Sequence, residues 1–480
     1  MDKPNIVLIL CDQLRADVLG CYGNSVVKTP NIDRLAASGI CFDRAYSQTP
    51  VCVPARHALI SGKNAFELGM LENTAKHPAP FVPLARLIRD RGYSTSAVGK
   101  MHFIPTREHF GFDRMRLSEG VPRHFFDDEY IQFLWNAGYK DIVEPYGPRS
   151  EKYYVPLVSR LPEAVHGSTW TADQAIDVIR KNRDRPFFLY AGFFKPHPPF
   201  DPCPPYDTLY PLDEIPEPAT ADSDMDPVDR IIPYQNGYKV GGTGNLSTAE
   251  IQKIRSYYYG TVTQLDKQVG RVLDALEAEG KRDNTIVILT ADHGEMLGDH
   301  HAFGKRCYYE ASTRVPFIMS WPQRFPQGEH RQQFAILPDI YTTLAQAVGA
   351  AVPEGTTGMN LTEAAQSADA SGRDCVVAEY GTGINLKFML RWGDKKYIYH
   401  TNGGQEELFD LASDPDEFEN IAAAHPAVCE DCRQQLAAYY REYGFSEALD
   451  GDGLRFYPYE APEVPGYLNQ YPRWPETVVE

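Results

Sequence analysis

Four predicted strands, each followed at once by polar residues, constrain this chain more than any other feature of its sequence. They cover residues 6–10, 94–98, 186–192 and 285–290. The first is a continuous aliphatic run between Pro4 and Asp12, which is typical of a central parallel strand covered on both faces. The pattern therefore predicts an open α/β sheet whose strands end in groups that can do chemistry.

Helix signals lie between these strands. Residues 29–39 carry an N-cap residue, a proline at the first helical position and a closing glycine. Further helices are predicted over residues 84–91, 171–180, 262–276 and 339–348, and further strands over residues 41–45 and 316–320. The helix of residues 262–276 is indicated by an apolar stripe at helical spacing. This alternation of strand and helix is that of an α/β domain.

A second, smaller unit is predicted after residue 365, because residues 351–373 are rich in small, polar and turn-forming types. Strands are predicted over residues 375–379, 386–392, 396–400 and 407–411, and a helix over residues 426–440. Adjacent antiparallel strands with one helix indicate a small α+β unit, so we assign residues 1–365 and 366–445 to two domains.

Residues 446–480 contain several prolines and are expected to form an extended aromatic tail. Its aromatic residues include Tyr457, Tyr459, Tyr467, Tyr471 and Trp474. We expect the tail to pack on the protein's own surface or on a partner subunit, and a homo-oligomer formed through it is one expectation.

Charge and composition restrict the partners. The formal charge of −18 argues against nucleic acid and anionic membranes, because long-range repulsion opposes the encounter. The first apolar run is too short for a secretory signal, and nine cysteines without a repeated spacing do not resemble a disulfide framework. These features predict a cytoplasmic protein. Cys429 and Cys432 form a lone C-x-x-C within a predicted helix and are interpreted as packing residues.

The polar residues at two strand ends predict a metal site. Asp12 and Gln13 follow the first strand, and Asp292 and His293 follow the last. The carboxyl ends of strands are where an open α/β sheet builds its ligand site. These hard and borderline donors suit one divalent cation such as Ca²⁺, Mg²⁺ or Mn²⁺, whereas a zinc site would have more His or Cys. The alternative for Asp12 is a cap on the following turn.

Five other polar residues predict a site for a tetrahedral oxyanion. Arg56, Lys100 and Lys305 supply positive charge in a protein of strong negative charge. His102 and His197 are candidate proton carriers, since imidazole exchanges protons near neutral pH. The alternatives are that the lysines are solvated and that His197 packs between prolines.

Cys52 lies in a stretch that favours a reactive centre. Pro50 and Pro54 restrict the backbone on either side, and Pro54 is expected to be the first residue of a short helix that Gly62 ends. The positive end of that helix, with Arg56 nearby, favours a thiolate or another anionic centre at position 52. The alternative is a buried cysteine in a loop.

These motifs, from Pro4 to about Ile421, resemble those of the type I sulfatases of the alkaline phosphatase superfamily. Cys52-Val53-Pro54-Ala55-Arg56 matches the C-x-P-x-R sequence in which these enzymes oxidise the cysteine to formylglycine. The other similar blocks are Thr29-Pro30-Asn31-Ile32-Asp33-Arg34-Leu35, Gly99-Lys100-Met101-His102, Lys195-Pro196-His197-Pro198-Pro199-Phe200, Asp292-His293-Gly294-Glu295-Met296-Leu297-Gly298-Asp299-His300 and Glu407-Leu408-Phe409-Asp410-Leu411. The ordered set is more specific than any one block.

The resemblance implies a large, mostly parallel mixed sheet sandwiched by helices, with a smaller C-terminal α+β subdomain that contains an antiparallel sheet. It also implies roles for the site residues. Asp12, Gln13, Asp292 and His293 would hold a metal, usually Ca²⁺, together with the modified Cys52. Arg56 would steady the formylglycine, Lys100 and Lys305 would bind sulfate oxygens, and His102 and His197 would transfer protons.

In the mechanism that the resemblance implies, the aldehyde is hydrated and one hydroxyl attacks sulfur while His197 protonates the leaving oxygen. His102 then helps to remove the proton of the second hydroxyl, and collapse of the hemiacetal releases sulfate. The substrate would be a small aryl or sugar sulfate, and a maturation enzyme that generates formylglycine would be a partner.

Two departures from the family pattern keep other functions open. Gln13 stands where many sulfatases have a second aspartate, and with His293 it also resembles the phosphonate monoester hydrolases of the superfamily. Val53 and His57 are bulkier than the residues common beside the modified cysteine. The first alternative is therefore a phosphonate monoester or phosphodiester hydrolase using the same site. The second is a non-catalytic metal-binding homologue that keeps an unmodified Cys52.

Overall fold

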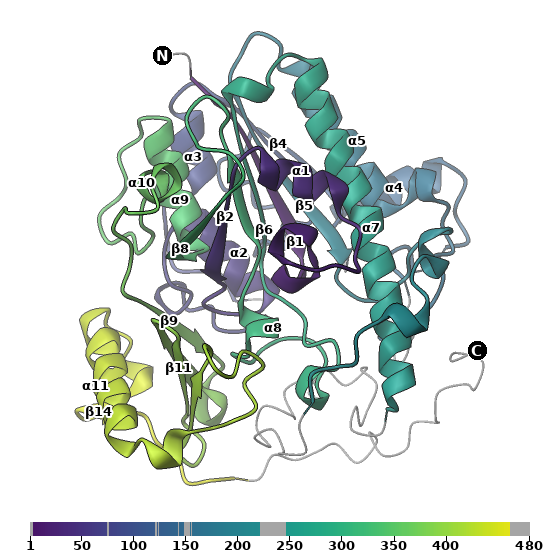
Figure 1. The fold of residues 1–480 in the computed structure, drawn as a ribbon. Coiled ribbons are helices and arrows are strands. Elements are labelled where there is room, and N and C mark those ends of the chain that lie inside the picture. Colours follow the sequence, from purple (N-terminus) through teal and green to yellow (C-terminus); the bar gives the residue numbers. More distant parts are fainter. Residues whose placement is uncertain are drawn as a thin grey trace.

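A large sheet flanked by helices on both faces, with a smaller sheet and one long helix at one end, forms the protein (Figure 1). The computed structural model describes residues 3–460 except 74–75, 121, 123, 143, 148–153, 155 and 221–245. The predicted fold class is confirmed, since the large sheet is mostly parallel and the smaller one is antiparallel.

The large sheet has eight strands within the described part of the chain. In spatial order they are β4 (Arg114–Leu117), β3 (Ser94–Gly99), β5 (Phe187–Pro196), β1 (Asn5–Asp12), β6 (Thr285–Ala291), β7 (Phe317–Ser320), β2 (Ile40–Tyr46) and β8 (Glu329–Ile336). Neighbouring strands pair in parallel except for β7, which is antiparallel to β6 and β2. The strands predicted from the sequence are thus confirmed, with β5 extending further toward the site than expected.

Strand β1 lies at the centre of the sheet because both of its faces are apolar. Its side chains from Ile6 to Asp12 are all buried. Val7 lies opposite Leu189 of β5 on one side and Val287 of β6 on the other. Because β1, β5 and β6 are parallel and in close register, their carboxyl ends meet at one edge of the sheet.

Helices cover both faces of this sheet (Figure 1). One layer contains α1 (Pro30–Ala37), α5 (Gly167–Lys181) and α7 (Thr248–Ala278), and the other contains α2 (Cys52–Ser61), α3 (Leu84–Arg89) and α9 (Pro338–Ala347). Helix α7 begins well before the predicted residue 262, because Ser247 and Glu250 form a capping box at its start. Shorter helices are α4 (Glu129–Asn136), α8 (Glu310–Thr313) and α10 (Thr362–Gln366).

The C-terminal unit is a four-stranded antiparallel sheet, as predicted. Its spatial order is β12 (Gln405–Asp410), β11 (Lys395–His400), β10 (Lys387–Trp392) and β9 (Cys375–Tyr380). One face packs on α11 (Pro426–Glu442), and the other face packs on apolar residues of the large domain such as Tyr46 and Met296. Cys429 and Cys432 are buried free thiols in the core beneath α11. Helix α10 spans the expected boundary at residue 365 and packs on β8, and the boundary itself stays a prediction.

The first part of the C-terminal tail packs on the protein's own surface. Strands β13 (Leu449–Asp450) and β14 (Gly453–Leu454) form a hairpin against α11. The Tyr457 N–H then donates to the Thr401 carbonyl at 2.8 Å. The rest of the tail, with Tyr467, Tyr471 and Trp474, lies outside the described residues.

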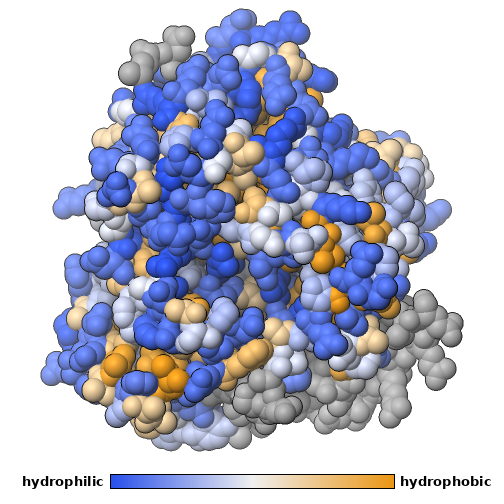
Figure 2. All heavy atoms as spheres, viewed as in Figure 1, coloured by the Kyte–Doolittle hydropathy of each residue, from blue (hydrophilic) through white to orange (hydrophobic). Residues whose placement is uncertain are grey.

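The face in view is mostly hydrophilic, as the net charge leads one to expect, and hydrophobic residues gather on it at the C-terminal unit (Figure 2). Among the described residues, no helix is both long enough and apolar enough to cross a membrane.

Candidate active site

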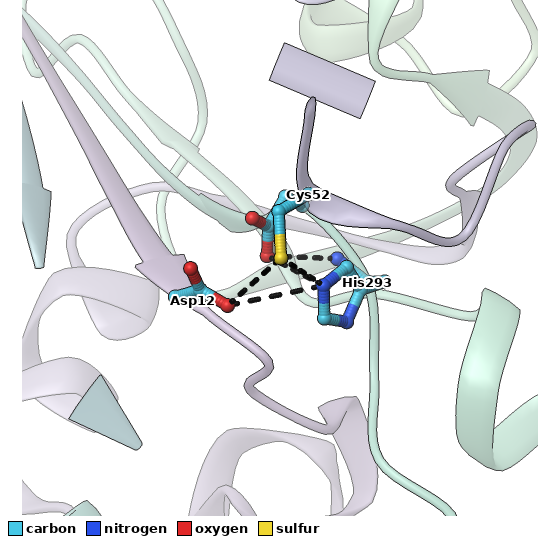
Figure 3. Close-up of side chains that lie close together, drawn as sticks. Asp12, Cys52 and His293 are labelled. Carbon is cyan, nitrogen blue, oxygen red and sulfur yellow. Dashed lines mark hydrogen bonds and ion pairs between the residues drawn. The ribbon is translucent and has the colours of Figure 1, made fainter. Parts of the chain in front are cut away.

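The carboxyl ends of β1 and β6 bring four potential ligands together. Asp12 is the last residue of β1, and Asp292 and His293 directly follow β6. Cys52, at the start of α2, lies over this edge of the sheet (Figure 3). One ligand atom from each of these residues lies within 4.8 Å of the others, and all four side chains are buried.

Helix α2 begins at Cys52, so the expectation that Pro54 is its first residue is wrong. The Ala55 N–H donates to the Val51 carbonyl at 3.1 Å, which closes the first turn around Cys52. A proline is tolerated at this third position because the first N–H groups of a helix have no intrahelical acceptor. Gly62 ends the helix with φ of 71°, as predicted. Cys52 therefore lies at the positive end of the α2 dipole.

Arg56 is fully buried and fixes the two aspartates. Its Nε donates to Asp292 Oδ2 at 2.8 Å, and its Nη2 donates to Asp12 Oδ2 at 3.1 Å. Its Nη1 donates to the Lys100 carbonyl at 2.6 Å. The other oxygen of Asp12, Oδ1, faces the Cys52 sulfur at 3.7 Å. The other oxygen of Asp292, Oδ1, accepts from the backbone N–H groups of Gln13 and His293, each at 3.1 Å. Arg56 thus sets the orientation of both carboxylates.

His293 is held with its Nε2 toward Cys52. Its Nδ1 donates to the Gly294 carbonyl at 2.9 Å, which leaves Nε2 directed at the Cys52 sulfur 3.2 Å away. A hydrogen bond of this kind selects the tautomer that can bind a metal.

The donor set fits one divalent cation. Two carboxylates and an imidazole nitrogen converge in a buried position, and oxygen-rich sets of this kind prefer hard cations. Burial and the neighbouring Asp12 charge raise the pKa of the Asp292 carboxyl despite the nearby Arg56. A bound cation would relieve this repulsion between the two carboxylates.

Two lysines add positive charge beside Cys52. Lys100 forms an ion pair with Asp12, and its ammonium lies 4.8 Å from the centre of the Phe194 ring. Lys305 donates to Gln13 Oε1, and both lysines are buried. Burial of the Cys52 thiol opposes its ionisation, but Lys305, Lys100 and His293 hold its pKa well below the usual range. Position 52 therefore stabilises an anionic atom.

Two histidines lie beside Cys52. His102 helps to lower the pKa of the Cys52 thiol, and Cys52 acts to raise the pKa of His197. The Nδ1 of His197 donates to the Pro198 carbonyl at 2.8 Å, which leaves its Nε2 for the site. Burial and the charge of Lys305 lower the pKa of His197 well below its ordinary value. The site thus combines an anionic centre, cations and two possible proton carriers.

Comparison with known families agrees with this chemistry. The family model described as sulfatase matches residues 4–350, which is well over half of the chain. The chain belongs to the sulfatase family. The model described as N-sulphoglucosamine sulphohydrolase, C-terminal, matches residues 298–442. The predicted family and the prediction of an enzyme are thus confirmed.

The sulfatase is similar over most of its length to characterised proteins. It is 31% identical over 451 residues to an arylsulfatase of Clostridium perfringens, which covers 87% of this chain and 90% of the relative. In fold it resembles the phosphonate monoester hydrolase of Agrobacterium radiobacter, with a TM-score of 0.79, 24% identity and coverage of 95% and 100% of the two chains. It also resembles BT4656, solved with its substrate D-glucosamine-2-N,6-O-disulfate, with a TM-score of 0.75, 22% identity and coverage of 93% and 99%.

The structure of the sulfatase brings together all the site residues predicted from the sequence. They are Asp12, Gln13, Cys52, Arg56, Lys100, His102, His197, Asp292, His293 and Lys305. Their separate roles in catalysis stay predictions.

Residues that support the site were missed by sequence reasoning. Glu119 accepts hydrogen bonds from the backbone N–H of Met101 at 3.3 Å and of His102 at 2.8 Å, and so holds the His102 segment. Lys195 forms a buried ion pair with Asp201 and closes the loop that carries His197. The position of Glu119 in the sequence gives no sign that it supports the site. Lys195 lies within the motif of residues 195–200, in which only His197 was interpreted as a site residue.

Proposed function

We propose that this sulfatase hydrolyses a sulfate monoester by means of a formylglycine formed from Cys52 and one divalent cation. The observation that carries the proposal is the convergence of Asp12, Asp292 and His293 on Cys52, with Lys100 paired to Asp12 and Lys305 bonded to Gln13 beside them. In the structure the Cys52 sulfur stands in for an oxygen of the hydrated aldehyde. That oxygen would benefit from the same charges, and from the α2 N-terminus, during attack on sulfur.

The cation would be held by Asp12, Gln13, Asp292 and His293, with residue 52 beside them. Ca²⁺ is the ion we propose, with Mg²⁺ or Mn²⁺ as alternatives that suit the same oxygen donors. When bound, such an ion stabilises negative charge on the attacking oxygen and on the sulfate group together. Arg56 keeps both aspartates oriented for this purpose through its hydrogen bonds to each.

Lys100 and Lys305 would hold the sulfate oxygens. Both ammonium groups are buried beside Cys52, where water screens their charge little. Lys100 is paired with Asp12 and Lys305 with Gln13, so each is already oriented before substrate arrives. Preorganised donors of this kind stabilise the charge that develops in the transition state.

His197 would donate a proton to the leaving oxygen, and His102 would take one from residue 52. Burial and Lys305 keep the pKa of His197 low, so His197 is neutral at neutral pH. A sulfate ester placed between the lysines brings negative charge that offsets their effect on the imidazole. His197 would thus gain its proton as the substrate binds.

The substrate we propose is a small sulfated sugar or aryl sulfate. Support comes from the arylsulfatase relative and from BT4656, whose structure contains a sulfated glucosamine as substrate. A maturation enzyme that converts Cys52 is a required partner in this proposal.

Hydrolysis of phosphonate monoesters or phosphodiesters is the second candidate. Gln13 is the observation that favours it, because a neutral amide gives the site one negative charge fewer than an aspartate would. The fold similarity to the Agrobacterium phosphonate monoester hydrolase adds support. A tetrahedral phosphorus centre would use the same lysines and the same nucleophile.

Two measurements test the proposal. The protein is produced together with a formylglycine-generating enzyme, and mass spectrometry of the peptide that contains residue 52 determines whether the thiol has become an aldehyde. A thiol that persists would support the non-catalytic alternative. The matured enzyme is then assayed on aryl sulfates, sugar sulfates, phosphonate monoesters and phosphodiesters. We expect release of sulfate to be fastest, and rapid phosphonate or phosphodiester hydrolysis without sulfate release would favour the second candidate.

A further inference from the structure

Glu295 is a fully buried carboxylate beside the site, with no role in the proposed reaction. Its Oε2 accepts a hydrogen bond from Gln13 Nε2. Its Oε1 accepts from the backbone N–H of Leu297 at 3.0 Å and from that of Gly304. Both oxygens thus act as acceptors, and one of them is directed at the side chain of Gln13.

The backbone of Gln13 is fixed independently of Glu295. Its N–H donates to Asp292 Oδ1 at 3.1 Å, and its carbonyl accepts from the Tyr258 hydroxyl at 2.8 Å. Its φ of 65° is in the left-handed region, which these two contacts help to hold. What they leave open is the orientation of the carboxamide.

That orientation decides whether Gln13 can bind a cation. The two ends of a carboxamide have nearly the same shape, but only the oxygen can coordinate a metal ion or accept from an ammonium group. Because Nε2 is committed to Glu295, Oε1 points the other way and accepts from Lys305. A flipped carboxamide would place its N–H groups against Lys305 and its oxygen against the Glu295 carboxylate.

We propose that Glu295 is a positioning residue that holds the Gln13 carboxamide with its oxygen toward Lys305 and the cation. The inference rests on the metal site of the proposed function. An aspartate at position 13 would need no residue to orient it, since its two oxygens are equivalent. This site instead has a neutral carboxamide at position 13, with the Glu295 carboxylate bonded to its Nε2.

Glu295 also couples Gln13 to the segment that carries Lys305. The Gly304 N–H donates to the same carboxylate, and Lys305 is the next residue. One buried side chain therefore sets the position of the Gln13 oxygen and of the backbone beside the ammonium group that donates to it. Partners of this kind behind a metal ligand commonly change metal affinity by about 10- to 100-fold when they are replaced.

An exchange of the two side chains tests the inference. In Glu295→Gln, the new amide oxygen has to accept from the Leu297 and Gly304 N–H groups, so the new NH₂ group faces the Gln13 NH₂ group, donor against donor. In Gln13→Glu, two carboxylates face each other. In the double variant Gln13→Glu, Glu295→Gln, a donor again faces an acceptor and an oxygen still faces Lys305.

Isothermal titration of the metal-free protein with Ca²⁺ is the readout, and it does not depend on turnover. We expect each single variant to bind Ca²⁺ about 10- to 100-fold more weakly than the wild type. We expect the double variant to recover to within about fivefold of the wild type, since coupled neighbours are not additive. Glu417→Gln is the matched control, because Glu417 is a buried carboxylate that pairs with Lys396 in the C-terminal unit. It should bind Ca²⁺ as the wild type does.

Unchanged Ca²⁺ affinity in Glu295→Gln, or additive losses in the double variant, would overturn the inference alone. A wild type that binds neither Ca²⁺, Mg²⁺ nor Mn²⁺ would instead overturn the metal site of the proposed function, and the inference with it. If Glu295→Gln does not fold, as circular dichroism will show, comparison of Gln13→Glu with the double variant makes the same test.

Discussion

Replacement of Arg56 by glutamine should destabilise the metal-free protein more than most single substitutions do. The guanidinium is fully buried and bonds Asp12, Asp292 and the Lys100 carbonyl. Glutamine is too short and has too few donors to satisfy these acceptors. The two aspartates would then lie close together with only Lys100, which is paired to Asp12, to offset their charge.

The expected loss follows from the burial of this group. Removal of one partner from a buried ion pair typically costs about 3–5 kcal/mol, because the remaining charge is left without compensation. Arg34→Gln is the matched control, since Arg34 bonds Asp274 at 2.6 Å at an exposed position. An exposed pair of this kind contributes about 0–1 kcal/mol. The contrast between the two variants isolates the effect of burial.

Urea denaturation followed by tryptophan fluorescence measures both losses, first with a chelator and then with Ca²⁺. Ca²⁺ should stabilise Arg56→Gln more than it stabilises the wild type, because a divalent cation returns positive charge to the same two carboxylates. A loss in Arg56→Gln no larger than that in Arg34→Gln would refute this account. An equal effect of Ca²⁺ on both proteins would show that the ion does not take over the charge compensation that Arg56 provides.

Three further predictions concern the nucleophile, a lysine and pH. Cys52→Ala should lower turnover by roughly 10⁴- to 10⁶-fold and leave Ca²⁺ binding and urea stability largely intact, since residue 52 supplies chemistry more than packing; a cooperative loss of folding would argue for a core cysteine. Lys305→Ala should lower kcat by about 10²- to 10³-fold as a lost oxyanion donor, whereas equal losses of activity and stability would indicate a structural lysine. Burial lowers the pKa of His57 from 6.5 to about 4, so the unfolded chain takes up a proton that the folded protein excludes. The contribution of neutral His57 to the free energy of unfolding is complete above pH 6.5 and falls by up to about 3 kcal/mol as the pH drops toward 4. In His57→Gln the urea midpoint should depend less on pH in this window. A pH dependence equal to that of the wild type would show that His57 is not its source.

Much of the fold could be predicted because its signals are local. The aliphatic run that ends at Asp12 indicates a buried parallel strand wherever it occurs, and a closing glycine such as Gly62 ends a helix by its own conformational freedom. The predicted starts of two helices were wrong because a local signal for an earlier start was overlooked. The capping box at Ser247 extended α7 toward the N-terminus, and the start of α2 at Cys52 made Pro54 its third residue.

The convergence of the site residues could also be predicted. Parallel neighbouring strands end at the same edge of a sheet, so Asp12 and Asp292 had to lie close together once their strands were recognised. Lys100 could be placed at this edge by the same rule, because it directly follows the strand that ends at Gly99. Cys52 could be proposed as a reactive centre from its helix start and charged neighbours, and the resemblance to the sulfatases supported both.

The sequence by itself thus determined the strands, the chemical groups at their ends and the family to which the chain belongs. The tertiary structure alone decided which partner each group has. Arg56 bonds two aspartates, Glu119 holds the His102 backbone, and Glu295 orients Gln13. The physical reason is that strand and turn preferences act over a few residues, whereas these hydrogen bonds join segments that only the packed core brings within about 3 Å of one another.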